Sequence, residues 1–175
     1  MNYCSNCGSS QLVWKKPAGE HLSRQVCEQC QMIHYQNPKI IAGCLPVWEN
    51  KILLCKRAIE PRYGLWTVPA GFMENGESIE EAAMRETWEE ANAKVSLKSL
   101  YMMYSIIRVD QLYVLFLGQL ENLDFHAGEE SLDVQLFSEE EIPWKELAFQ
   151  IVEKTVRNYF NDFKNHTFPT HIGKL

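Results

Sequence analysis

Apolar residues along the chain fall into short runs separated by turn residues, which predicts a protein built largely of strands. The ranges 40–48 (IIAGCLPVW) and 51–57 (KILLCKR) are rich in aliphatic and β-branched residues, and Glu49-Asn50 between them predicts a hairpin. Further strand-like runs cover 100–109, 111–117 and 132–137. Strands interleaved with few helices predict an α/β domain with a mixed sheet and helices on its faces.

Two capping signatures and one amphipathic pattern mark the predicted helices. Ser78 with Glu81, and Ser138 with Glu141, have the S-x-x-E spacing in which each side chain caps the other residue's backbone N–H. We therefore expect helices to begin at both serines. Apolar residues at helical spacing predict a last helix from about residue 149 to 163.

Length and composition fit one full domain with a small module. The chain has 175 residues, 46% hydrophobic and 23% charged, so it can bury a core and keep a polar surface. No apolar run approaches the roughly 18 residues of a membrane helix, and we predict no membrane span. The start, MNYCSNCGSS, has the pattern of neither a secretory signal nor a transit peptide, so we expect a cytoplasmic protein.

The net charge of −6 is unevenly distributed. Residues 1–36 carry +1, from three basic and two acidic residues, which leaves 14 bases against 21 acids, or −7, for the rest. Phosphate binding to duplex nucleic acid depends on Lys and Arg, so this balance argues against nucleic acid as the main partner. The acidic remainder is compatible with a site that collects cations.

Four of the six cysteines form two C-x-x-C pairs, Cys4 with Cys7 and Cys27 with Cys30. Two such knuckles can surround one Zn²⁺ with four thiolates and leave no open position, so the ion would be structural and do no chemistry. Two disulfides or a redox pair are the alternatives. A reducing compartment disfavours the first, and the lack of a thioredoxin-like βαβ pattern disfavours the second.

The sequence between the cysteine pairs and the first long strand marks a domain boundary. Pro38 requires an extended lead-in, and we predict a zinc ribbon over 1–36 followed by a second domain over 37–175. A module this small depends on its metal, because its apolar area alone cannot stabilise a fold. Cys44 and Cys55 lie in apolar runs of the second domain and are expected in its core.

Three glutamates lie near the end of the strand-loop-helix unit that runs from residue 64 to 93. At about 100° per residue, Glu86, Glu89 and Glu90 share one sector of the predicted helix. A solvated acidic face is the ordinary interpretation of such a run. However, Ile79, Ala82 and Ala83 fall in or beside the same sector, so we predict that the carboxylates point inward.

Inward carboxylates at this spacing repel one another and lose hydration unless a cation lies nearby. Carboxylate ligation favours Mg²⁺ or Mn²⁺ over Zn²⁺. Arg85 precedes Glu89 by four residues and is placed to form an ion pair with it. Magnesium on protein carboxylates usually completes its shell with water and substrate phosphates, so a phosphate ester or anhydride attacked by water is the expected chemistry.

These residues also match a known pattern. The chain resembles the Nudix box, G-x5-E-x7-R-E-U-x-E-E-x-G-U with U aliphatic, through Gly71-x5-Glu77-x7-Arg85-Glu86-Thr87-x-Glu89-Glu90-x-Asn92-Ala93. Two positions depart from the pattern. Thr87 replaces the aliphatic residue, which concerns packing, and Asn92 replaces the glycine at the helix end, where Asn is the next best residue.

The resemblance implies a Nudix α/β/α sandwich with a mixed sheet, preceded by the zinc ribbon, and hydrolysis of a nucleoside diphosphate linked to another group. It implies that Glu86, Glu89 and Glu90 bind metal and act in catalysis. The same resemblance gives supporting roles to Gly71, Glu77 and Arg85.

A general base must receive a proton from the attacking water. In similar ADP-ribose hydrolases this role often falls to a glutamate in a loop outside the box, and here the loop 127–131 offers Glu129 and Glu130. We favour Glu130 as the catalytic base, although two solvated loop acids would give the same pattern.

The substrate is predicted from longer similarities. The segments YQNPKIIAGC, CKRAIEPRYGLWTVPAG, RETWEEA and EESL resemble plant chloroplast FAD and ADP-ribose pyrophosphatases, which implies cleavage of FAD to FMN and AMP, or of ADP-ribose. Zinc ribbons also precede Nudix domains in NADH pyrophosphatases, which usually carry S-Q-P-W-P-F-P after the box. This chain has Ser99-Leu-Tyr-Met-Met-Tyr104 there, so NADH is the alternative substrate.

Candidate substrate contacts lie before the 64–93 unit and within it. Arg57 and Arg62 could contact phosphates, and Trp66 or Phe72 could stack on a ring, with surface charge or core packing as the ordinary alternatives. A second class of function is a non-catalytic binding protein that uses the zinc ribbon on a Nudix scaffold. The intact carboxylate set argues against it. The expected partner is a small nucleotide, and the ribbon edge or the aromatic last helix could form a homodimer.

Overall fold

The computed structural model describes all residues 1–175, which form two compact units, Met1–Asn37 and Pro38–Leu175. The smaller unit contains an antiparallel sheet in the order β1-β2-β3, made of β1 (Leu12–Lys15), β2 (Arg24–Cys27) and β3 (Ile33–His34). Its core is small, so the geometry of its two cysteine turns dominates the unit.

Both cysteine turns of the smaller unit use the same local geometry. Gly8, at φ 74°, donates its N–H to the Cys4 carbonyl over 2.9 Å, and Gln31, at φ 59°, donates to the Cys27 carbonyl over 2.9 Å. The left-handed conformation suits glycine best, which is why Gly8 after the first pair is favourable.

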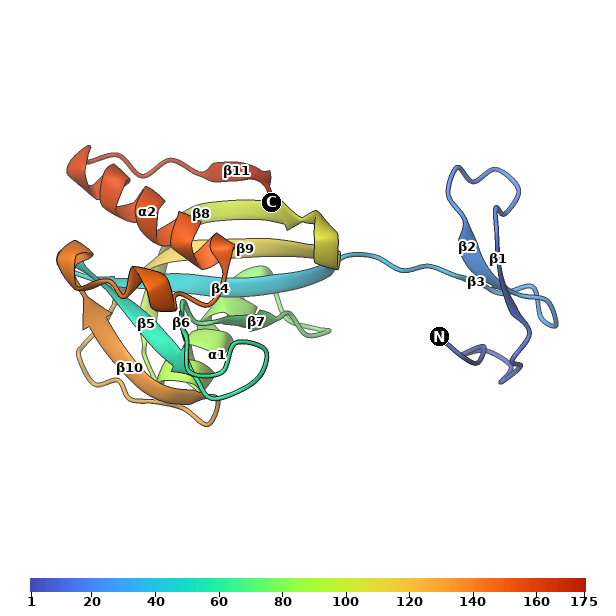
Figure 1. The fold of residues 1–175 in the computed structure, drawn as a ribbon, viewed down its shortest axis with the longest axis horizontal. Helices are drawn as coiled ribbons and strands as arrows, with labels where there is room; N and C mark the ends of the chain where they lie inside the picture. The colour runs from blue at the N-terminus through green and yellow to red at the C-terminus, as the bar shows by residue number, and fades with distance from the viewer. The chain divides into compact units, whose positions relative to one another are not determined.

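The larger unit is built on an eight-stranded mixed sheet (Figure 1). The strand order is β10-β5-β4-β9-β8-β11, with β6 paired to β5 and β7 paired to β4. β4 pairs in parallel with β9, and β11 pairs in parallel with β8, whereas the other pairs are antiparallel. Its strands are β4 (Lys39–Trp48), β5 (Lys51–Arg57), β6 (Trp66–Thr67), β7 (Ala70–Phe72), β8 (Val95–Ile106), β9 (Gln111–Leu120), β10 (Ser131–Phe137) and β11 (His171–Lys174).

One helix covers each face of this sheet, as Figure 1 shows. Alternation along β9 separates the two cores: Leu115 packs with Val156 of α2 (Gln150–Lys164), whereas Val114 and Phe116 pack with Ala83 of α1 (Ile79–Ala91). Each fully buried aliphatic side chain of this kind contributes about 1.5–3 kcal/mol. The predicted α/β/α sandwich is confirmed, and no helix of the chain is long and apolar enough to cross a membrane.

The caps of α1 form as the sequence predicts. Ser78 accepts a hydrogen bond from the Glu81 N–H over 3.2 Å, and Glu81 accepts one from the Ser78 N–H over 2.7 Å. At the other end Asn92 is left-handed, at φ 48°, and donates its N–H to the Trp88 carbonyl over 2.7 Å. Thr87, which departs from the Nudix pattern, is fully buried and donates its hydroxyl to the Ala83 carbonyl, so its polar group is satisfied.

Several element boundaries differ from the sequence expectation. The strand expected over 100–109 starts five residues earlier and ends at Ile106, because residues 107–109 form a 3-10 turn. The prediction of a helix beginning at Ser138 is wrong. Its capping box forms, but the element is a 3-10 turn over Glu139–Glu141, and Pro143, which lacks an N–H, follows two residues later. The last helix is confirmed, with Phe149 as its N-cap.

Candidate active site and cysteine cluster

The three glutamates at the end of α1 differ in exposure. Glu90 is only 7% exposed and Glu86 exposes 12% of its side chain, whereas the Glu89 side chain is 55% exposed. The predicted inward direction is therefore confirmed for Glu86 and Glu90 and is wrong for Glu89. Glu89 lies at the edge of the shared sector, and its carboxylate reaches toward Arg85 on the solvent side of the helix.

Arg85 holds three carboxylates at once. Its guanidinium donates to both carboxylate oxygens of Glu77 over 2.7 and 3.0 Å, and to the carboxylates of Glu86 and Glu89 over 2.7 and 3.0 Å. A fifth bond goes to the Phe72 carbonyl over 3.2 Å. All five N–H donors of the guanidinium are thus occupied. The ion pair predicted between Arg85 and Glu89 is confirmed.

This network fixes the charges around it. The hydrogen bonds from Arg85 and from the Glu74 N–H lower the pKa of Glu77 to about 2. The pKa of Arg85 is raised, chiefly by its hydrogen bonds to Glu77. Arg85 and Glu77 are therefore a permanent ion pair over the pH range in which the protein would work, and they keep Glu86 and Glu89 in place.

Strand β7 passes directly behind the Glu86 carboxylate. A Cβ added at Gly71 would overlap both Glu86 carboxylate oxygens, so glycine lets this carboxylate keep its position against the strand. The backbone conformation of Gly71 needs no glycine, and the reason for the residue is therefore space alone.

The two inward carboxylates are buried at an electrostatic cost. Burial raises the pKa of Glu90 to about 8, with a further rise from the charge of Glu86, while the positive charge of Arg57 opposes it. Burial also raises the pKa of Glu86. A bound cation would offset this cost, and oxygen donors select a hard ion, so the donor set and the tight fit at Gly71 are suited to Mg²⁺ or Mn²⁺.

A loop after β9 is attached to the end of α1. The N–H groups of His126 and Gly128 donate to the carbonyls of Ala91 and Glu90 over 2.9 and 3.0 Å, and the Asn92 side chain donates to the His126 carbonyl over 3.3 Å. A Cβ at Gly128 would overlap the Glu89 carbonyl oxygen. The loop therefore crosses the helix end in van der Waals contact.

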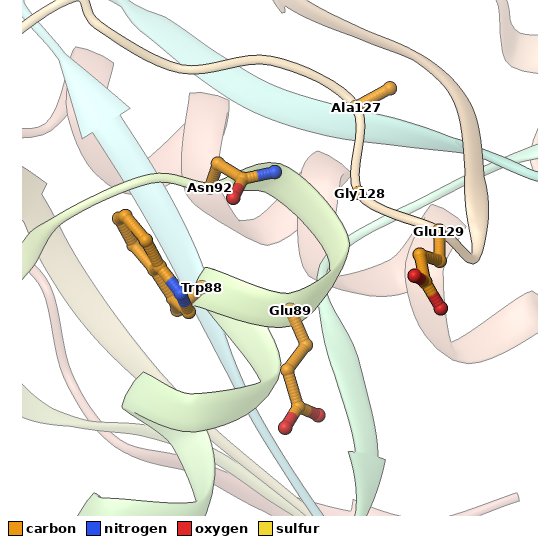
Figure 2. A pocket seen from close by; sticks show the side chains of 6 residues that line it. All are labelled: Trp88, Glu89, Asn92, Ala127, Gly128 and Glu129. Atoms are coloured by element: carbon orange, nitrogen blue, oxygen red, sulfur yellow. The ribbon is translucent and has the colours of Figure 1, made fainter.

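The loop carries both candidate bases, and they face different surroundings. The charge of Glu130 contributes to the raised pKa of Glu86 and of Glu90, so Glu130 lies on the side of the inward carboxylates. Glu129 instead lines a hollow with Trp88 and Glu89 (Figure 2). The choice of Glu130 as general base stays a prediction.

The four residues expected to contact substrate differ in exposure and packing. Arg57 is half-buried, with its guanidinium 5.3 Å from the Phe149 ring centroid, and Arg62 is exposed in the following turn. Trp66 is 6% exposed and packs edge-on against the core ring Phe137, so its proposed stacking on substrate is wrong. Phe72 is 49% exposed and remains available.

One polar cluster away from the carboxylates was missed from the sequence. Asp162, only 5% exposed, accepts a hydrogen bond from the Tyr101 hydroxyl over 2.8 Å and lies 2.7 Å from His171 Nε2. Asp162 stands three residues after the buried Tyr159 on α2, and a charged residue at that helical spacing is a signal that could have been used. The cluster fixes β11 to the body of the unit and stays apart from the site chemistry.

The cysteine pairs of the smaller unit converge on one point. The sulfur atoms of Cys4, Cys7, Cys27 and Cys30 all lie within 4.8 Å of one another. The shortest contacts join the two pairs, Cys4 to Cys30 and Cys7 to Cys27, each at 3.6 Å, far beyond the ~2.05 Å of a disulfide. A single tetrahedral ion fits this donor set.

The surroundings of Cys30 favour its thiolate. At Cys7 a hydrogen bond from the Ser9 backbone lowers the pKa, but burial and the neighbouring thiols together raise it. The Asn6 side-chain amide lies 3.6 Å from the Cys30 sulfur, and this hydrogen bond, followed by one from the Met32 backbone, lowers the pKa of Cys30 to about 6. Thiolate is the form that ligates zinc.

Comparison with known families decides the assignment of both units. The family described as NUDIX domain matches residues 37–159, and the family described as Nudix N-terminal matches residues 2–36. The chain belongs to the Nudix family. It is therefore a Nudix hydrolase with an N-terminal zinc ribbon, and the identification made from its box is confirmed.

Individual relatives agree with this placement. The chain is 28% identical to an ADP-ribose pyrophosphatase of Methanocaldococcus jannaschii, over 87% of this chain and 93% of the relative. It is 33% identical to the chloroplastic Nudix hydrolase 19 of Arabidopsis thaliana, over 89% of this chain but 36% of that protein. The resemblance to plant chloroplast Nudix hydrolases is thus confirmed.

Other relatives are longer than this Nudix hydrolase. It is 27% identical to the NAD-capped RNA hydrolase NudC of Vibrio vulnificus, over 93% of this chain and 62% of NudC. The chain thus spans about three fifths of the NudC length. A crystal structure of a NUDIX hydrolase from Nitrosomonas europaea superposes with a TM-score of 0.96 at 48% identity, covering 100% of this chain and 99% of the other.

Proposed function

We propose that this Nudix hydrolase cleaves the diphosphate of a nucleoside diphosphate derivative in a reaction that requires Mg²⁺ or Mn²⁺. The observation that carries the proposal is the pair of buried carboxylates, Glu86 and Glu90. Arg85 holds Glu86 beside Gly71, whereas Glu90 forms no salt bridge, although the charge of Arg57 acts on it. ADP-ribose is the first substrate to test, because the ADP-ribose pyrophosphatase of M. jannaschii is covered over nearly its whole length. FAD, cleaved to FMN and AMP, is the second.

Each residue at the site has a proposed task. Glu86, Glu89 and Glu90 hold the divalent ion, which supplies charge neutralisation at the diphosphate and a more acidic bound water. Glu130 accepts the proton of the attacking water. Arg85 is a positioning residue that orients Glu86 and Glu89 and touches no substrate, because its donors are all in use.

Arg57 is the proposed phosphate contact. Its charge acts on Glu90, which places it on the side of the carboxylates, and its Nε donates to the Pro61 carbonyl over 2.9 Å, leaving its remaining donors free. Arg62, exposed in the neighbouring turn, is the second proposed contact, and Phe72 replaces Trp66 as the ring beside the site.

A substrate panel tests the proposal. We expect AMP release from ADP-ribose or FAD with Mg²⁺, measured by chromatography, with NADH and diadenosine polyphosphates as the other members. Glu89→Gln is expected to abolish release. Glu153→Gln is the matched control, because Glu153 forms a comparable i,i+4 ion pair with Arg157 on α2. No turnover of any member, together with tight binding of RNA or protein by the ribbon, would favour the non-catalytic scaffold.

We further propose that Cys4, Cys7, Cys27 and Cys30 bind one structural Zn²⁺. The support is the convergence of four thiols from two knuckles, with no position left for water or substrate. Metal analysis of the purified protein is expected to give one zinc per chain, and a Cys27→Ser variant is expected to give none. Retention of zinc in that variant would contradict the proposal.

A further inference from the structure

Helix α1 covers only part of its face of the eight-stranded sheet. It contacts mainly β4 and β7, and β8 much less. In Figure 1 α1 lies level with β4 and β7, whereas β8 and β11 lie toward the top of the view. The core that α1 forms with β9 has only three buried residues, Ala83, Val114 and Phe116, whereas the core under α2 is much larger. On the α1 side, the face of β8 and β11 is therefore left without a helix.

The part of the sheet that α1 leaves open is apolar. Leu100 and Met103 of β8 pack against the α1 core from one side and stay half-buried. The parallel register of β11 sets Ile172 beside Met103, and Ile172 is 67% exposed. The side chain of His171 contacts α2, so the alternation of the strand turns Ile172 to the α1 face. The apolar area thus continues from β8 onto the edge strand.

One flank of α1 borders this apolar area. Glu80 and Met84 lie four residues apart and therefore on the same side of the helix, and Met84 is 40% exposed. Arg85 donates to the Phe72 carbonyl of β7, so the carboxylate flank of α1 faces β7. At about 100° per residue, Glu80 and Met84 fall on the other flank, which faces β8.

Charged residues of opposite sign stand at the two sides of the area. Lys174 follows Ile172 by two residues on β11 and points to the same face. Neither Lys174 nor Glu80 forms a salt bridge within the chain, and both are exposed. We call the whole area the α1–β11 surface, made of Glu80, Met84, Leu100, Met103, Ile172 and Lys174.

We propose that two copies of this chain pack face to face through the α1–β11 surface. A two-fold axis parallel to the strands places α1 of one copy over β11 of the other, because this rotation exchanges the two sides of the surface. Met84 then meets Ile172 of the second copy, and Glu80 meets Lys174 of the second copy. An acid and a base on opposite sides of an apolar centre complement a copy of themselves, so the occupant is this same chain.

The proposed dimer leaves the carboxylates of α1 open. They lie on the flank that faces β7, whereas the α1–β11 surface begins on the other flank. The surface belongs neither to the ribbon nor to α2, the two places where the sequence suggests an interface. Self-association through it does not depend on the proposed hydrolysis, so it is tested without any substrate.

Sedimentation of the full-length protein over a range of concentrations tests the proposal. We expect a monomer–dimer equilibrium whose Kd rises about thirtyfold or more in Ile172→Asp, because a charge then enters the apolar centre twice. Leu123→Asp is the control, since Leu123 is 54% exposed in the loop after β9 and lies outside the surface. A protein that stays monomeric, or a dimer that Ile172→Asp does not weaken, would overturn the proposal.

Charge reversal tests the pairing without changing the apolar centre. Glu80→Lys and Lys174→Glu are each expected to raise the Kd of the dimer about tenfold, because like charges then meet in both copies of the pair. The double variant is expected to return to within about threefold of the wild type. Both side chains are exposed, so each variant is expected to fold. Weakening in both single variants without recovery in the double variant would contradict the proposed packing.

Discussion

The cysteine cluster of the ribbon and the carboxylate cluster of α1 bring metal ligands together in opposite ways. The four thiols lie within 4.8 Å of one another, whereas the carboxylates of Glu86, Glu89 and Glu90 are not gathered so closely. Arg85 holds Glu86 and Glu89, and Glu89 stays half in solvent. The first arrangement closes around an ion, and the second leaves room for water and phosphate. Closure suits a structural metal and openness suits a catalytic one.

Removal of each metal is expected to have the largest effect and to distinguish the cysteine cluster from the carboxylate cluster most clearly. A zinc chelator is expected to unfold residues 1–37, because structural zinc supplies about 10–16 kcal/mol of apparent binding energy to such modules. Removal of Mg²⁺ is expected to stop hydrolysis and leave both units folded. Amide NMR spectra recorded after each treatment check both outcomes. A ribbon that keeps its spectrum without zinc would show that its thiols are not the source of its stability.

Separate substitutions of the two loop acids test which of them is the general base. Glu130→Gln is expected to lower kcat by about 10²–10⁴-fold, the usual range for a general base. Glu129→Gln is the matched control, and its effect on ADP-ribose turnover should be far smaller, because Glu129 faces the hollow and not the inward carboxylates. Rate measurements at saturating Mg²⁺ decide the matter, and the reverse ranking would make Glu129 the base.

Arg85→Lys tests whether the carboxylate cluster of α1 needs Arg85 to orient its metal ligands. A lysine keeps the charge but cannot supply five fixed N–H donors, so Glu86 and Glu89 lose their orientation. We expect Mg²⁺ affinity to fall about 10–100-fold, the range seen when partners of metal ligands are changed. Titration of activity with Mg²⁺ measures this, with Arg157→Lys as the control on α2. Equal Mg²⁺ affinity in both variants would remove the positioning role.

Asn6→Ala is the corresponding change at the cysteine cluster. Its effect on metal affinity should be the smallest of the changes predicted. The long hydrogen bond from Asn6 to the Cys30 sulfur lowers the pKa of that thiol, but three other thiols and both turns remain. We expect zinc affinity to fall less than about tenfold, as for the loss of a single outer partner. Competition with a chromophoric chelator gives the value. A loss larger than that of Arg85→Lys for Mg²⁺ would reverse the order of the two clusters.

The sequence predicted those features that depend on local spacing. The hairpin at Glu49-Asn50, the capping box at Ser78, and the burial of Cys44 and Cys55 follow from neighbours along the chain, and all are confirmed. The inward direction of Glu86 and Glu90 also followed, because helical periodicity places them beside the small apolar residues of α1.

Features that depend on tertiary contacts were missed or wrong. Trp66 is an aromatic residue of the kind that can stack on a substrate ring. However, Phe137, from a strand distant in sequence, packs edge-on against it. The strand β11 has no recognisable pattern and exists because it pairs with β8 and because Asp162 contacts His171. Glu89 was assigned to the interior because a helical wheel gives direction and not the depth to which the sheet covers the helix.

The attachment of the 126–130 loop to the last carbonyls of α1 has an evolutionary consequence. Since these hydrogen bonds set the spacing between Glu90 and Glu130, that spacing does not depend on the length of the preceding segment. Residues 121–124 are exposed and directly precede the attached part. Insertions there would project into solvent, so new contacts to bulkier molecules can be gained while the reacting groups keep their separation.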